Sequence, residues 1–268
     1  PKLIVGARLA LSDSAVEWVA LPADLAAYSR LSRLLSIGKR RAAKGDCRLD
    51  RADLAEWGAG LVLIALPPDV LAPDALAPDP GSGEPALADI AAMARRFPGC
   101  VFLGAAPRYD GRDQRRFDRL AALAQRAGLA MVAVGDVLMH RAARRPLADV
   151  LTCLREGCTI DTIGLRRLAN GERRLKSGAE MARLFHRYPA ALRRSVEIAD
   201  RCAFRLDDLR HQYPHEDRDG EPAQARLERL SRAGMVWRYP DGPSPKIAAR
   251  MEKELTLIAE LGYAPYFL

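Results

Sequence analysis

Short apolar runs alternate with segments of helical periodicity over the first part of the chain. Five of these runs have the length and the composition of β-strands. The predicted strands are Lys2–Leu11, Glu17–Leu21, Leu61–Leu66, Cys100–Gly104 and Ala130–Val134. The last three contain almost no polar residue, which is typical of parallel strands that are buried on both faces.

Helical patterns lie between these runs. Tyr28, Leu31, Leu34 and Leu35 recur at spacings of three and four, and this helix is expected to end before Gly45. Further helices are predicted at Ala86–Arg96, Arg112–Ala127 and Pro146–Glu156. Strand-then-helix units with short connections predict a parallel α/β architecture.

The pattern changes near Ile163, where strand signals stop and helices follow one another. The clear helices of this second part are Pro189–Arg201, Ala223–Trp237 and Pro245–Leu261. A domain boundary is therefore expected between residues 160 and 175. Residues 73–85 are rich in Pro, Gly, Asp and Ser, so an exposed loop is predicted there.

The charge of the chain favours an anionic partner. The net charge is +8, and from Arg141 to Arg210 there are 16 Lys and Arg residues against 9 Asp and Glu. A local excess of this kind suits the phosphate backbone of nucleic acid. Five cysteines without a CxxC spacing are typical of a reduced, cytoplasmic protein, and no apolar run reaches transmembrane length. Because the chain starts at Pro1 inside a predicted strand, it is expected to be a piece of a longer protein.

One strand end is a candidate for chemistry. The strand that begins at Met131 is followed by Asp136 and His140, and barrel enzymes place their active sites at the carboxyl ends of strands. A hydrolytic metal centre, however, needs His and carboxylate ligands from several strand ends. The segment Cys100–Ala106 supplies none, and Leu61–Leu66 is followed by two prolines. No working multinuclear metal site is therefore expected, and the chain has no P-loop, GxSxG or strand-borne GxGxxG motif.

Five segments together carry a resemblance to a known family. They are KLIVGARLAL, YSRLSRLLSIGKRRAAKGDCRLDRADL, VAVGDVLMHRAARRPLADVLTCLREG, EIADRCAFRLDDLRHQYPHE and ELTLIAELGYAPYFL. In this order they resemble the C-family bacterial DNA polymerases, which include the DNA polymerase III alpha subunit, and in particular the error-prone (ImuC-type) branch. The resemblance runs from Pro1 to Leu268 and is weakest over residues 67–85.

The resemblance implies a fold and an activity. Residues 1–165 would form the PHP domain, a distorted (β/α)7 barrel that lacks its first strands here. Residues 166–268 would form a basic, mainly α-helical connection to the polymerase palm. The whole protein would be a DNA-directed DNA polymerase that acts in damage-induced mutagenesis and translesion synthesis in the cytoplasm. Its Mg²⁺ ions would be held by palm carboxylates beyond Leu268, so this stretch is expected to be inactive alone and to hold no cofactor.

The resemblance also implies a degenerate metal site. The family pattern Asp-Val-His matches Asp136-Val137-Leu138, so Leu138 stands at a ligand position and cannot bind a metal. The HxH motif of the first family strand is missing from this sequence. Asp136 is therefore interpreted as a remnant, and His140 is not assigned a ligand role.

Three functions stay open at this point. The first is a structural part of a polymerase that acts on primer-template DNA and deoxynucleotides, with some basic side chains contacting the DNA. These side chains would be Arg141, Arg144, Arg145, Arg166, Arg167, Arg173 and Arg174. The second is a PHP-type metal-dependent phosphoesterase. The third is an interaction module for the sliding clamp or for mutagenesis accessory proteins, and no membrane partner is expected.

Overall fold

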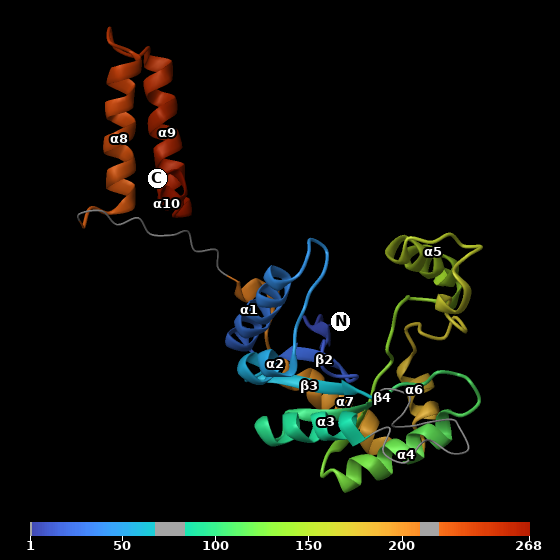
Figure 1. The fold of residues 1–268 in the computed structure, drawn as a ribbon. Coiled ribbons are helices and arrows are strands. Elements are labelled where there is room, and N and C mark those ends of the chain that lie inside the picture. Colours follow the sequence, from blue (N-terminus) through green and yellow to red (C-terminus); the bar gives the residue numbers. More distant parts are fainter. Residues whose placement is uncertain (1, 68–83, 210–219) are drawn as a thin grey trace. The chain divides into compact units, whose positions relative to one another are not determined.

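A computed structural model describes residues 2–67, 84–209 and 220–268. The chain divides by its internal packing into two compact units, Pro1–Asp208 (unit 1) and Leu209–Leu268 (unit 2), and each is described by itself (Figure 1). Unit 1 contains the sheet and most of the helices. Unit 2 is helical.

The sheet of unit 1 has five strands that lie side by side in chain order. They are β1 (Ala7–Ala10), β2 (Glu17–Pro22), β3 (Leu61–Leu66), β4 (Val101–Ala105) and β5 (Ala130–Ala133). β1, β2 and β3 pair antiparallel, whereas β3, β4 and β5 pair parallel. Within the described residues the sheet is open, with β1 and β5 at its edges. The predicted α/β class is therefore confirmed, with a mixed sheet.

The parallel arrangement expected from the three strand–helix units is confirmed for their strands β3, β4 and β5, whereas β1 and β2 add an antiparallel hairpin to the sheet. Residues 11–16 join β1 to β2 by a short turn, and a parallel pair needs a crossover of a dozen or more residues. β1 is also shorter than the predicted strand Lys2–Leu11, because residues 2–6 lie outside the sheet and Leu3 is exposed.

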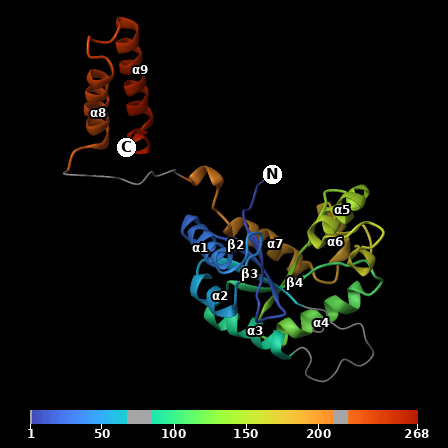
Figure 2. The same cartoon turned by 45° about the horizontal axis from the view of Figure 1, so that its top comes forward.

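Apolar side chains cover both faces of the sheet, as the strand compositions indicated. Along β3, Leu61 and Leu63 point into the main core, and Val62 and Ile64 point into a second core on the other face. The main core is completed by helices α1 (Leu25–Arg41), α2 (Arg51–Trp57), α3 (Glu84–Arg96) and α4 (Asp113–Arg126). The second core is covered by α7 (Pro189–Arg201), which contributes Ile198 (Figure 2).

The starts of the first two helices follow from their capping residues. Asp24 accepts a hydrogen bond from the N–H of Ala27 at 2.7 Å and so begins α1. Asp50 and Asp53 form a reciprocal capping box at the start of α2. The predicted apolar face of α1 is buried at Leu31 and Leu34.

The second half of unit 1 contains shorter elements. They are η2 (Ala142–Arg144), α5 (Arg145–Glu156), η3 (Gly164–Arg166), α6 (Gly178–Leu184) and η4 (Leu206–Asp208). Phe185, just after α6, is fully buried and stacks on Phe117 of α4 with ring centroids 4.5 Å apart. Phe204 stacks in the same way on Tyr28 of α1 at 4.3 Å. Unit 1 therefore continues past residue 165. The PHP domain expected from the resemblance ends at residue 165, and that boundary stays a prediction.

Unit 2 is built from α8 (Ala223–Arg238), α9 (Pro245–Leu261) and the short α10 (Ala264–Phe267). Its small core contains Leu227, Leu255 and Ala264, with Met251 and Ile258 packed against them. These last residues belong to the apolar stripe of the predicted helix Pro245–Leu261, whose limits are confirmed. No described helix in either unit is both long and apolar enough to span a membrane.

Candidate functional site

A cavity of about 530 Å³ lies where the parallel strands of the sheet end. Leu66 at the end of β3 and Gly104 near the end of β4 form part of its apolar wall, and Asp136 reaches it from the loop after β5. Open α/β folds bind ligands at this edge, because the loops that follow parallel strands meet there. This strand-end cavity is therefore the candidate site of unit 1.

Asp136 is held by two arginines from distant parts of the chain. Its Oδ1 accepts a hydrogen bond from Nη1 of Arg8 at 2.6 Å, and its Oδ2 lies 2.7 Å from Nη2 of Arg173. Nε of Arg173 also donates to the backbone carbonyl of Asp136 at 2.9 Å. The backbone of Asp136 is left-handed, with a φ of 43°, which Asp and Asn adopt more readily than most residues. The carboxylate thereby ties the loop after β5 to β1 and to residue 173.

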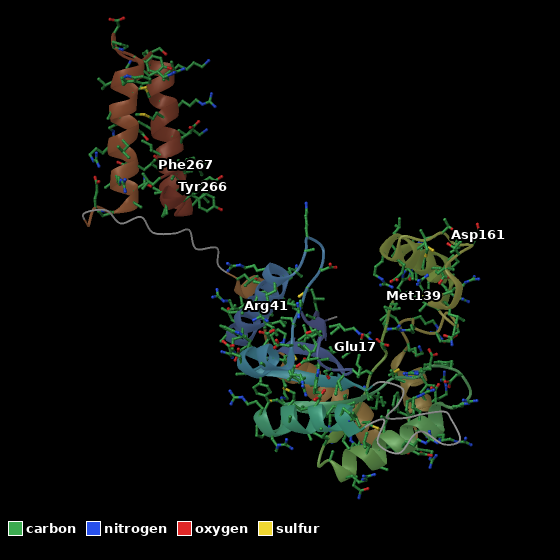
Figure 3. All side chains as sticks on the ribbon, in the orientation of Figure 1. Glu17, Arg41, Met139, Asp161, Tyr266 and Phe267 are labelled. Atoms are coloured by element: carbon green, nitrogen blue, oxygen red, sulfur yellow. The ribbon has the colours of Figure 1, made fainter. Side chains whose placement is uncertain are left out.

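Arg8 bridges a second carboxylate at the same end of the sheet. Its Nε donates to Oε2 of Glu17 at 2.8 Å, and Glu17 is the first residue of β2 (Figure 3). Burial acts to lower the pKa of Arg8, but the hydrogen bond with Glu17 and the attraction of Asp136 outweigh it and raise that pKa. Arg8 therefore stays charged and joins three chain segments at the mouth of the cavity.

A buried arginine of α4 lines the same cavity. Arg116 is only 4% exposed, its Nη1 donates to Oδ1 of Asp113 at 2.6 Å, and its Nη2 pairs with Asp110. Burial acts to raise the pKa of Asp110, but the hydrogen bond from Arg116 and its positive charge outweigh this effect. The pKa of Asp110 therefore lies below its ordinary value. The charge of Arg116 is thus balanced by Asp110 in the loop before α4 and by Asp113, the first residue of α4.

The residues considered for metal binding do not come together as a metal centre. Leu138 is 52% exposed, and its backbone N–H donates to the carbonyl of Arg173 at 2.8 Å. His140 is exposed, and the carboxylate of Asp136 is occupied by two arginines. Within residues 2–67, 84–209 and 220–268, no three His, Cys, Asp or Glu side chains are grouped so that they could hold a metal ion. Four arginines, Arg8, Arg108, Arg116 and Arg173, line the cavity together with the carboxylates of Glu17 and Asp136.

Guanidinium groups limit what this cavity can do chemically. An arginine does not lose its proton in proteins, so none of these side chains can act as a general base. Arginine does bind carboxylates and phosphates strongly through charge-assisted hydrogen bonds. Here Arg8 and Arg173 already bind a carboxylate of the chain itself, that of Asp136. We call Arg8, Asp136 and Arg173 the ion-pair clamp.

The seven arginines predicted to contact DNA fall into two groups. Five have an acidic partner: Arg145 and Arg167 pair with Asp149, Arg166 with Glu156, Arg173 with Asp136, and Arg174 with Glu180. Arg141 and Arg144 are exposed, and no acidic side chain in the described part of the chain pairs with either. Because a paired charge attracts phosphate less, Arg141 and Arg144 are the stronger candidates for contact with an anion.

Comparison with known proteins shows which proteins the chain is related to. No family model matches it. Over 268 residues it is 56% identical to an error-prone DNA polymerase of Ruegeria pomeroyi and 41% identical to one of Caulobacter vibrioides. It is also 45% identical, over 269 residues, to an error-prone DNA polymerase of Rhodopseudomonas palustris. The chain is a homologue of the error-prone DNA polymerases. It spans 23% to 24% of the length of these three relatives.

For this homologue of error-prone DNA polymerases, the residues alone indicated Asp136 but not its partners. Two weak signals were present in the sequence. Arg8 interrupts an otherwise apolar strand pattern, and Arg116 lies beside Phe117 on the side of α4 that faces the core. A charged residue at a core position is expected to have a partner, because an unpaired buried charge is costly. The sequence does not show which carboxylate that partner is.

Proposed function

We propose that the chain is the part of an error-prone DNA polymerase that carries a PHP-type domain, over residues 1–165, followed by a basic helical connection toward the palm. The whole polymerase would add deoxynucleotides to a primer across damaged template in the cytoplasm, with Mg²⁺ held by palm carboxylates beyond Leu268. The proposal rests mainly on the 56% identity, over the whole chain, to a protein named error-prone DNA polymerase. The open mixed sheet is compatible with an incomplete barrel.

Within that polymerase, the role proposed for the strand-end cavity is structural. Its support is the ion-pair clamp, in which the one carboxylate at the end of β5 is bound by Arg8 and Arg173. A side chain that is neutralised by two arginines is a poor ligand for a divalent cation. The purified chain is therefore expected to contain no stoichiometric metal by elemental analysis, and to lack phosphatase turnover with added Mn²⁺ or Zn²⁺. Bound metal together with turnover would overturn the structural role.

Contact with the DNA backbone is proposed for Arg141 and Arg144, because both are exposed and unpaired among the described residues. Fluorescence anisotropy with labelled primer-template DNA over a salt series tests this contact. Replacing both arginines by alanine is expected to weaken binding and to reduce the slope of log K against log salt by about 2, since each lost phosphate contact removes about one released counterion. The matched control replaces Lys39 and Arg40, two exposed cations at the end of α1. An unchanged slope in the first variant, or an equal loss in the control, would contradict the proposal.

The proposed protein partners are the sliding clamp and mutagenesis accessory proteins. A pull-down with these partners should use point substitutions on the surface of residues 139–174. A deletion of residues 146–210 would remove the whole basic region, but it would also remove α7, whose Ile198 closes the second core of the sheet. Loss of binding in such a deletion would report unfolding as readily as a lost interface.

A further inference from the structure

Residues 139–174 form a loop, here called the α5 loop, that stands off the sheet of unit 1 (Figures 1 and 2). Its helix α5 turns an apolar stripe toward solvent. The stripe consists of Leu147, Val150, Leu151 and Leu154, which are 45% to 74% exposed. Spacings of three and four place these side chains on one face of the helix. The opposite face holds Asp149, which is 1% exposed, and the buried Cys153.

The base of the α5 loop is fixed to the rest of unit 1. The backbone N–H groups of Leu138 and Met139 donate to the carbonyl of Arg173 at 2.8 and 3.1 Å, and the N–H of Leu175 donates to the carbonyl of Met139 at 3.1 Å. The guanidinium of Arg173 then binds Asp136 in the ion-pair clamp. In Figure 3, Met139 lies nearer to the sheet and Asp161 farther along the loop. The loop is therefore attached at both ends by hydrogen bonds and by charge.

The inner face of α5 is fixed by charge as well. Nε of Arg167 donates to Oδ2 of Asp149 at 3.2 Å, and Nε of Arg145 lies 3.6 Å from the same oxygen. Arg145 also donates to the backbone carbonyl of Leu168. If α5 rotated to bury its leucines, the buried carboxylate of Asp149 would lose both arginines, and leaving a buried charge unpaired is costly. The exposure of the stripe is thus a consequence of how the loop is held together.

The size and surroundings of the stripe suit a binding surface. Its four side chains expose an apolar area on the order of 400 Å², which is comparable to the largest patch on a typical monomer and is often functional there. The α5 loop contains eight arginines and four acidic residues, so its net charge is +4. Arg144 and Arg155 lie next to the stripe, three residues before Leu147 and four after Leu151. Asp149, the one acid within the span of the stripe, is buried on the opposite face, and Glu156, two residues after Leu154, is already shared between Arg155 and Arg166.

We propose that the α5 stripe binds an amphipathic helix of another polypeptide, in which an apolar stripe is flanked by Asp and Glu. The apolar side chains of such a helix would pack on Leu151 and Leu154. Its acids would pair with Arg144, which has no acidic partner among the described residues, and would compete with Glu156 for the exposed Arg155. A second copy of the chain is a poor occupant, because it would bring the same arginines against each other. Duplex DNA would match the arginines but leave the leucines unburied. The inference stands on unit 1 alone and does not depend on the polymerase proposal.

The test uses the 268-residue chain and a designed, fluorescein-labelled peptide of about 18 residues, long enough to populate a helix. Leucines at helical spacing form one face of the peptide, and glutamates flank them; a matched peptide carries lysines in place of the glutamates. The glutamate peptide is expected to bind and to lose affinity when NaCl is raised from about 50 to about 300 mM, whereas the lysine peptide is not expected to bind. Leu151→Glu should weaken binding at least about tenfold, as expected for a central interface side chain. Val196→Glu is the control, because Val196 is an exposed apolar residue on another helix, α7.

Each other outcome would overturn the proposal in a distinct way. Equal binding of both peptides, or equal effects of Leu151→Glu and Val196→Glu, would show that the contact is not specific to α5. Dimers in sedimentation that Leu154→Glu converts to monomers would assign the stripe to a second copy. Primer-template DNA binding that Leu151→Glu abolishes would assign it to nucleic acid. Peptide binding by the 268-residue chain but not by a full-length polymerase containing it would show that the protein's own remaining length covers the stripe.

Discussion

The ion-pair clamp predicts a measurable loss of stability in Asp136→Asn. Asparagine keeps the size of the side chain and tolerates the left-handed backbone at this position, so the substitution removes mainly the charge. An exposed ion pair contributes about 0.2–1 kcal/mol, and Asp136, with a side chain only 24% exposed, takes part in two such pairs. Two arginines would also be left facing each other without a carboxylate. We expect the free energy of unfolding to fall by about 1–2 kcal/mol.

Urea unfolding followed by tryptophan fluorescence measures this loss. Trp18 of β2 is completely buried in the core of unit 1, whereas Trp237 is 80% exposed in unit 2 and adds little to the transition. With a dependence on urea of about 2 kcal/mol/M, the expected loss lowers the midpoint by about 0.5–1 M. A double-mutant cycle with Arg8→Met should give a coupling energy of about 0.5–1 kcal/mol, because the two residues share one hydrogen-bonded pair.

The control for this prediction is Asp207→Asn. Asp207 pairs with Arg205 at 3.3 Å, but its side chain is 84% exposed, so its loss should change stability by less than about 0.5 kcal/mol. If Asp136→Asn and Asp207→Asn have the same midpoint of urea unfolding, the ion-pair clamp does not stabilise the strand ends. A coupling energy near zero between residues 8 and 136 would refute the reasoning even if Asp136→Asn were destabilised, because the loss would then come from another contact.

Three further predictions follow from the same unit. The pKa of Asp110 is lowered in the folded state, so its contribution to stability is present above its unfolded pKa and is lost as the pH falls through the folded pKa. In Asp110→Asn, the free energy of unfolding should therefore depend less on pH below about pH 4, as measured by circular dichroism. A side chain at Gly104 would place its Cβ 3.0 Å from Cγ2 of Ile64, so Gly104→Val should cost about 1–3 kcal/mol by overpacking, measured by urea unfolding. A chain cut after residue 165 should bind a hydrophobic dye and lose cooperative unfolding, whereas residues 1–208 should unfold cooperatively, because α7 covers one face of the sheet.

Local periodicity predicted most of the elements, and long-range pairing decided the rest. The limits of α7 and α9 agree with their predicted ranges, because a proline opens each helix. The strand direction of β1 and β2 did not follow from their composition, since apolar residues suit both kinds of pairing. It followed from the length of the turn between them, which forces a hairpin.

The candidate site was predictable in position but not in chemistry. Asp136 follows β5 at the edge where α/β proteins bind ligands, and the sequence shows this directly. Its partners come from residues 8 and 173, which are separated from it by 128 and 37 positions. No local pattern indicates that two arginines so far away meet one carboxylate. The same limit applies to α5, because no local pattern indicates that Asp149 pairs with Arg145 and Arg167 and so leaves the apolar stripe on the exposed face.

The basic second half illustrates why charge counted along a sequence overstates a binding surface. Most of the arginines in the α5 loop, including Arg145, Arg167 and Arg173, are used to fix the loop to its own carboxylates and carbonyls. Such pairs hold the loop in place but leave little field for an external anion, because each charge is compensated at contact distance. Arg141 and Arg144, which have no acidic partner within the described residues, lie at the start of the loop, and Arg144 immediately precedes α5. This free charge lies next to apolar side chains that DNA would leave unburied, which favours a protein helix as the partner of the stripe. The DNA contact proposed for Arg141 and Arg144 does not need the stripe.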